Sequence, residues 1–128
     1  MNPSPSIEHS HLEHRLWINE LEFYREEIGI LEKHVVEILS KNSRNEIVEK
    51  GELFKGQLHR YTQRIAELEM EINEAEKLLA LFLESNQNID AENVKVGDQE
   101  IMRNKIGAFK KDYYGLKKKV LDFEVEWM

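Results

Sequence analysis

Residues 47–82, IVEKGELFKGQLHRYTQRIAELEMEINEAEKLLALF, carry the pattern that decides the fold. Apolar side chains recur here at alternating intervals of three and four residues, which is typical of a helix that packs along one narrow seam. In heptad notation the d positions are Ile47, Phe54, Tyr61, Leu68, Ala75 and Phe82, and the a positions are Gly51, Leu58, Ile65, Ile72 and Leu79. The repeat predicts a helix over about 44–85, roughly 60 Å long.

The preceding segment carries a second seam and predicts a helix over about 7–40. Its a positions are Ile7, Leu21, Ile28 and Val35, and its d positions are Trp17, Tyr24, Leu31 and Ile38. Polar Ser10 and His14 interrupt this seam near its beginning. Two starts are compatible with the sequence: Pro5 at the first helical position, or a capping box in which Ser10 and Glu13 satisfy each other's backbone N–H groups. We expect the helix to begin between residues 5 and 10.

Short polar segments separate the helices. Ser43 and Glu46 form a capping-box pair directly after Lys41 and Asn42, so a tight turn joins the first two helices as an antiparallel hairpin. Residues 86–97, NQNIDAENVKVG, lose the heptad pattern and are interpreted as a linker, after which Asp98 is a plausible N-cap.

A third seam predicts a helix over about 98–128. Its d positions are Met102, Phe109, Leu116 and Phe123, and its a positions are Ile106, Tyr113, Val120 and Trp127. The sequence therefore predicts an all-α single domain over 1–128, an antiparallel up-down-up three-helix bundle with coiled-coil-like heptad seams. In architecture alone this pattern is similar to spectrin-type repeats and other antiparallel three-helix coiled coils, and the residues carry no family signature.

Charges flanking the first and third seams have opposite signs. Glu13, Glu20, Glu27 and His34 occupy successive g positions of the first helix, and Arg103, Lys110 and Lys117 occupy successive e positions of the third. In parallel helices g faces e, so these columns are expected to pair and to set the register. If the linker runs back along the bundle, Glu20 meets Arg103. If it does not, the third helix covers the end of the second and the columns are offset.

Composition restricts the class of function. The net charge of -7 argues against a general nucleic-acid binder, and the absence of Cys removes thiol chemistry and Cys-based zinc sites. The start of the chain has no signal-peptide pattern, and its longest apolar run, residues 78–83, is too short to span a bilayer. There is no phosphate-binding loop and no nucleophile elbow. We expect a cytoplasmic, non-enzymatic protein without a cofactor.

Two sets of apolar residues are candidates for contact with another molecule. The run Leu78, Leu79, Ala80, Leu81, Phe82 and Leu83 covers every face of a helix, and neighbours within one chain would cover only part of it. Linker residues Ile89, Val94 and Val96 are the alternative cover. Leu16, Phe23 and Ile30 form a second line at c positions, which is either an interface or the edge of a wide core-facing stripe. These residues predict a homo-oligomer or the binding of a partner helix.

Two weaker candidates involve charged and metal-ligating side chains. Glu8, His11 and His14 have spacings at which imidazole nitrogen and carboxylate oxygen reach one point, so they are candidate metal ligands. The run 110–119, KKDYYGLKKK, interleaves lysine with tyrosine and is a candidate for binding anionic surfaces. Most such charge runs are solvated faces, and a solvated helix start is the alternative for the histidines.

Overall fold

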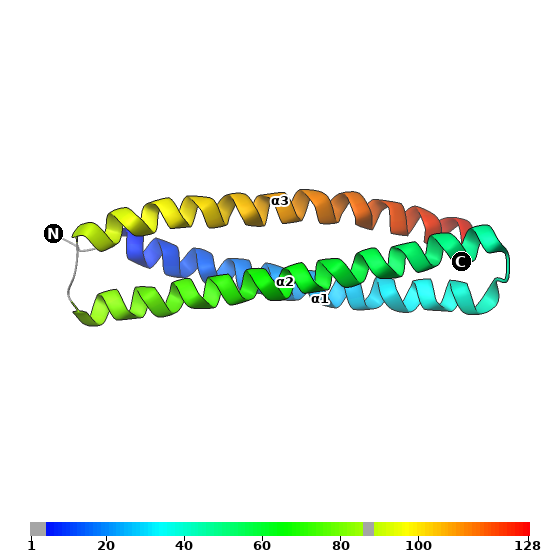
Figure 1. The fold of residues 1–128 in the computed structure, drawn as a ribbon, viewed down its shortest axis with the longest axis horizontal. Coiled ribbons are helices and arrows are strands. Elements are labelled where there is room, and N and C mark those ends of the chain that lie inside the picture. Colours follow the sequence, from blue (N-terminus) through cyan, green and yellow to red (C-terminus); the bar gives the residue numbers. More distant parts are fainter. Residues whose placement is uncertain (1–4, 86–88) are drawn as a thin grey trace.

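The computed structural model describes residues 5–85 and 89–128, with side chains described for 7–81, 84 and 99–128. Over these residues the fold is all-helical, with three helices and no strand: α1 (Pro5–Lys41), α2 (Asn45–Ser85) and α3 (Ile89–Trp127). The helices have 37, 41 and 39 residues, so they are nearly equal in length. Figure 1 shows α1 and α3 running in the same direction and α2 running in the opposite direction along a narrow rod.

The helix ends follow local chemistry. Pro5 is the first residue of α1, where its fixed φ fits a helix and its missing N–H is no loss. Residues 42–44 separate α1 from α2, and Asn42 Nδ2 donates to the carbonyl of Ile38 at 2.7 Å, which satisfies one of the last carbonyls of α1. A connection of three residues favours antiparallel packing of α2 against α1.

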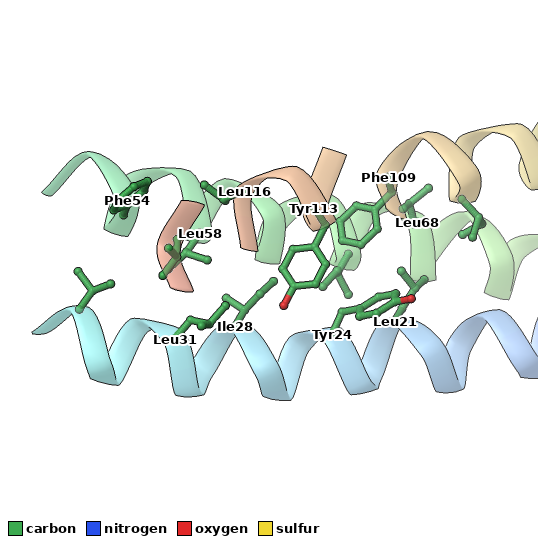
Figure 2. Close-up of a cluster of buried hydrophobic side chains, with 14 of the residues drawn as sticks. Leu21, Tyr24, Ile28, Leu31, Phe54, Leu58, Leu68, Phe109, Tyr113 and Leu116 are labelled. Carbon is green, nitrogen blue, oxygen red and sulfur yellow. The ribbon is translucent and has the colours of Figure 1, made fainter. Parts of the chain in front are cut away.

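The core is one continuous cluster between the three helices. All the seam residues of α1 from Trp17 to Ile38 are buried. The contributions of α2 and α3 are Ile47, Phe54, Leu58, Ile65, Leu68, Ile72, Met102, Ile106, Phe109, Tyr113, Leu116, Val120 and Phe123. Halfway along the rod the cluster is aromatic, with Tyr24 and Tyr113 at a centroid distance of 5.2 Å (Figure 2) and Tyr61 and Phe109 at 5.7 Å. This burial is the main stabilising contribution to the fold.

The predicted linker over 86–97 is wrong over most of its length, because α3 begins at Ile89 rather than near Asp98. The Asn, Asp and Gly residues there lower helix propensity, but one interior glycine costs only about 1 kcal/mol, which helix continuation and neighbouring helices can offset. α3 begins at the end of the rod where α2 ends (Figure 1), so the connection does not run back along the bundle. The side chains of Ile89, Val94 and Val96 lie outside the described residues.

Gly51 of α2 provides a test of packing at the hairpin end. A Cβ at this buried glycine would lie 2.5 Å from Leu39 Cδ2, whereas a Cβ at exposed Gly56 would have nothing within 4 Å. We expect Gly51→Leu to lower the free energy of unfolding by about 1–3 kcal/mol through overpacking. Gly56→Leu should leave it unchanged or raise it by up to about 1 kcal/mol through helix propensity. Chemical denaturation compares the two; equal effects would contradict the close contact between α1 and α2.

Candidate functional site

Side chains of α1 and α3 meet at a constant offset of 90 residues. The pairs are Glu13–Arg103, Glu20–Lys110, Tyr24–Tyr114, Glu27–Lys117 and His34–Glu124. A fixed offset requires two helices that run in parallel without slipping over this whole length. The predicted pairing of the α1 glutamates with the α3 cations is confirmed. Arg103 pairs with Glu13 rather than with Glu20, so the offset alternative is the one observed.

These charged pairs form a ladder along the α1/α3 boundary. Arg103 donates to Glu13 from Nε at 3.0 Å and from Nη2 at 2.7 Å, and the Nζ atoms of Lys110 and Lys117 lie 2.7 Å from Glu20 and Glu27. Arg103 holds the pKa of Glu13 below its usual value through the hydrogen bond it donates, although burial opposes this shift. Because Lys110 and Lys117 are engaged here, the run 110–119 presents fewer lysines to an anionic surface than its sequence suggests.

Three tyrosines reinforce the middle of the ladder. The Tyr24 and Tyr114 hydroxyls lie 2.8 Å apart, and the Tyr113 hydroxyl donates to Glu27 Oε1 at 2.9 Å. Burial, followed by these hydrogen bonds, raises the pKa of both Tyr24 and Tyr113 well above the usual value of 10. The hydroxyls therefore stay neutral at physiological pH and serve as fixed hydrogen-bonding groups.

An exposed apolar row lies directly beside the ladder. Leu16, Phe23 and Ile30 of α1 are 52%, 56% and 54% exposed, so they do not belong to the core. The wide core-facing stripe that the sequence left open is thus excluded for these three residues. On α3, half-exposed Tyr114 and Leu121 form a row across the ladder from the α1 row, and Ile30 and Leu121 line a surface hollow of about 210 Å³ together with Leu31 and the ladder residues Glu27, His34, Lys117 and Glu124. We call Leu16, Phe23, Ile30, Tyr114 and Leu121 the α1/α3 apolar face.

The apolar run near the end of α2 is only partly covered. Leu79 is buried, as its seam position predicts, whereas Leu78 and Leu81 are 48% and 57% exposed. The side chains of Phe82 and Leu83 lie outside the described residues. Leu78 and Leu81 stand three residues apart and so lie on one side of α2, and they are the part of this run that the described residues leave exposed.

A polar network connects all three helices near the start of α1. His14 is 1% exposed, and its Nδ1 lies 2.6 Å from Glu76 Oε2 while its Nε2 lies 2.9 Å from Gln99 Oε1. Gln99 Nε2 donates to Glu13 Oε1 at 3.0 Å, which links this network to the ladder. Exposed His11 also contacts Glu76 through Nδ1. A buried polar side chain is tolerated only when it is hydrogen-bonded in this way.

The histidines therefore meet a carboxylate of α2 rather than the predicted Glu8, which is exposed. Among the residues whose side chains are described, no group of three or more His, Asp and Glu is arranged to hold a metal ion. Sequence reasoning missed Glu76 and Gln99, although Gln99 stands one heptad before Ile106 and so was readable as a polar seam residue facing His14.

The difference in burial between His14 and His11 yields a test of this network. Both contact Glu76, but only His14 also fills space in the interior. We expect His14→Ala to lower the free energy of unfolding by about 2–4 kcal/mol, because Glu76 and Gln99 lose a buried partner and a void remains. His11→Ala should change it by less than about 1 kcal/mol. Chemical denaturation measures both, and equal losses would contradict a structural role for His14.

A second charged cluster, on the α1/α2 side, has an unusual carboxyl group. Arg25 Nη2 donates to Glu69, and its Nε donates to Glu22 at 3.1 Å. Burial, followed by a hydrogen bond with Glu22, raises the pKa of Glu69 from 4.5 to about 6, although Arg25 opposes the shift. The same hydrogen bond lowers the pKa of Glu22. Glu69 thus holds a proton in the folded state at pH values where the unfolded chain has lost it.

This shift predicts a defined pH dependence. A raised carboxyl pKa contributes stability that is present below pH 4.5 and is lost as pH rises to about 6. Between these values the difference in unfolding free energy between the native protein and Glu69→Gln should fall by on the order of 1 kcal/mol. Denaturation at a series of pH values measures it, with exposed Glu67→Gln as the control. Parallel curves for native protein and Glu69→Gln would refute the prediction.

Further comparisons add no functional assignment. Over the described residues, none of the helices contains an apolar stretch of the length needed to cross a bilayer. No protein-family model matches the chain, and neither a curated protein nor a solved structure matches it.

Proposed function

We propose that this chain is a non-enzymatic interaction protein, an up-down-up three-helix bundle with coiled-coil-like seams that self-associates or binds a partner helix through apolar helix faces. The observation that carries the proposal is the α1/α3 apolar face, whose three α1 members are each more than half exposed. A row of large apolar side chains at seven-residue spacing matches what one helix presents to another.

The position of the face also supports the proposal. The Glu–Lys ladder joins α1 to α3 between the two apolar rows, so an occupant would meet apolar side chains on both sides of charges that already have partners. Scattered single apolar residues on a surface need no explanation, but five that line one helix–helix boundary do.

Leu78 and Leu81 offer a second, smaller face at the end of α2. Both are about half exposed, and they lie on α2 whereas the row of Leu16, Phe23 and Ile30 lies on α1. An assembly that used both faces would contain more than one kind of contact. The two faces can be separated by mutation because they lie on different helices.

Solution mass tests the proposal. The native protein should exceed its monomer mass of 15.2 kDa as concentration rises. Phe23→Lys, and separately Leu81→Lys, should shift the mass toward the monomer without loss of helicity, because each places a charge in an apolar contact. Met70→Lys is the matched control, since Met70 is exposed on α2 away from both faces. Light scattering on a sizing column and far-UV circular dichroism provide the readouts.

Two results would contradict the proposal. One is equal behaviour of Phe23→Lys, Leu81→Lys and Met70→Lys in an associating protein. The other is a native protein that stays monomeric at all concentrations and binds no synthetic amphipathic helical peptide in a fluorescence titration.

A further inference from the structure

We propose that the occupant of the α1/α3 apolar face is a second copy of this chain, related by a two-fold axis parallel to the rod. Each α1 then packs against α3 of the other copy, and the two copies run in the same direction. The inference rests on the proposed function and specifies its partner and geometry.

The face consists of two rows at matching heights. Leu16, Phe23 and Ile30 repeat every seven residues along α1, and Tyr114 and Leu121 have the same spacing along α3, with Gly107 seven residues before Tyr114 at the height of Leu16. Because contacts between α1 and α3 join residues 90 apart, each α1 member stands level with one α3 member. A surface whose two halves have equal spacing and equal height can pack against a copy of itself.

Two orientations of the two-fold axis are possible for such a face. An axis parallel to the rod places the α1 row of one copy on the α3 row of the other, so that Phe23 opposes Tyr114. An axis across the rod places α1 of one copy on α1 of the other, and α3 on α3, with the two copies running in opposite directions. Apolar contacts alone do not choose between these arrangements.

The charges that flank the face favour the parallel arrangement. Exposed Glu26 lies between Phe23 and Ile30 on the outer side of α1, and exposed Lys118 lies between Tyr114 and Leu121 on the outer side of α3. In the parallel arrangement Glu26 of each copy opposes Lys118 of the other. The arrangement with the axis across the rod is called the crossed arrangement. When Tyr114 of one copy packs on Tyr114 of the other in this arrangement, Lys118 of each copy opposes Lys111 of the other, so the dimer contains two like-charge contacts.

Shape and size agree with a weak dimer. A Cβ at Gly107 would have nothing within 4 Å, so this position leaves room for Leu16 of the second copy. Each of the five side chains of the face exposes on the order of 100 Å², giving roughly 500 Å² per copy against about 800 Å² in a standard interface. We therefore expect dissociation in the micromolar range, with the net charge of -7 per copy opposing association.

Charge reversal at the two flanking positions tests the arrangement. Sedimentation equilibrium should show that Lys118→Glu and Glu26→Lys each raise the dimer dissociation constant roughly tenfold, because each creates two like-charge contacts. Glu26→Lys makes the net charge less negative, so a weaker dimer cannot result from overall repulsion. The double variant, and an equimolar mixture of the two single variants, should both regain dimerisation. Arg60→Glu, at an exposed position of α2 that belongs to neither apolar face, changes net charge as Lys118→Glu does and serves as the control.

Each other result overturns the inference in a distinct way. A dimer that becomes tighter in Lys118→Glu indicates the crossed arrangement, because the new carboxylate would then face Lys111. A dimer in which Lys118→Glu and Arg60→Glu behave alike uses a different face. A native protein that is monomeric at every concentration excludes a second copy but leaves the proposed function standing if the amphipathic peptide binds in a manner that Phe23→Lys abolishes.

Discussion

The fixed register between α1 and α3 is the constraint on which the other features of this structure depend. Every side-chain pair that joins residues 90 apart, from Glu13–Arg103 to His34–Glu124, requires that neither helix slide by even one turn. That register brings Tyr24 to Tyr114 and Tyr113 to Glu27, and it places the exposed residues of both helices level with one another. Both the interior and the proposed interaction face therefore follow from one alignment.

Hydrophobic burial supplies the stability, whereas polar contacts select the register. A heptad seam shifted by seven residues would bury similar apolar area, so burial alone distinguishes poorly between registers. Each exposed ion pair adds at most about 1 kcal/mol. His14 is different, because any slip would leave its two buried ring nitrogens without Glu76 and Gln99, and an unpaired buried polar group costs about 1–3 kcal/mol. A polar residue on an apolar seam is a known device for fixing register.

The sequence was sufficient for the features that depend on local pattern. Intervals of three and four residues identified the helices, and the seam residues of α1 from Trp17 to Ile38 are the ones that are buried. Opposite charges at e and g positions identified α3 as the neighbour of the glutamates of α1. These features were predictable because each is specified by residues within a few turns of each other or by a column of uniform sign.

The remaining features depend on relations between distant segments. The start of α3 at Ile89 was missed because Asn, Asp and Gly weaken a local helix signal that the folded chain overrides. Glu76 was missed as a partner of His14 because nothing in either segment specifies which turn of α2 stands beside that histidine. The c positions of α1 were ambiguous for the same reason, since a row beside a seam is core or surface according to how closely the next helix approaches.

The same dependence applies to any partner of this protein. Leu16, Phe23 and Ile30 belong to α1, whereas Tyr114 and Leu121 belong to a helix about 90 residues later, so the α1/α3 apolar face exists only when both helices are in register. An isolated α1 helix would expose its seam residues, which the bundle buries, as well as this row, and a partner could then bind either surface. Folding hides the seam and leaves the row exposed beside a ladder of paired charges. Recognition through this face would therefore report on the folded state, and loss of the register would disrupt the interface together with the core.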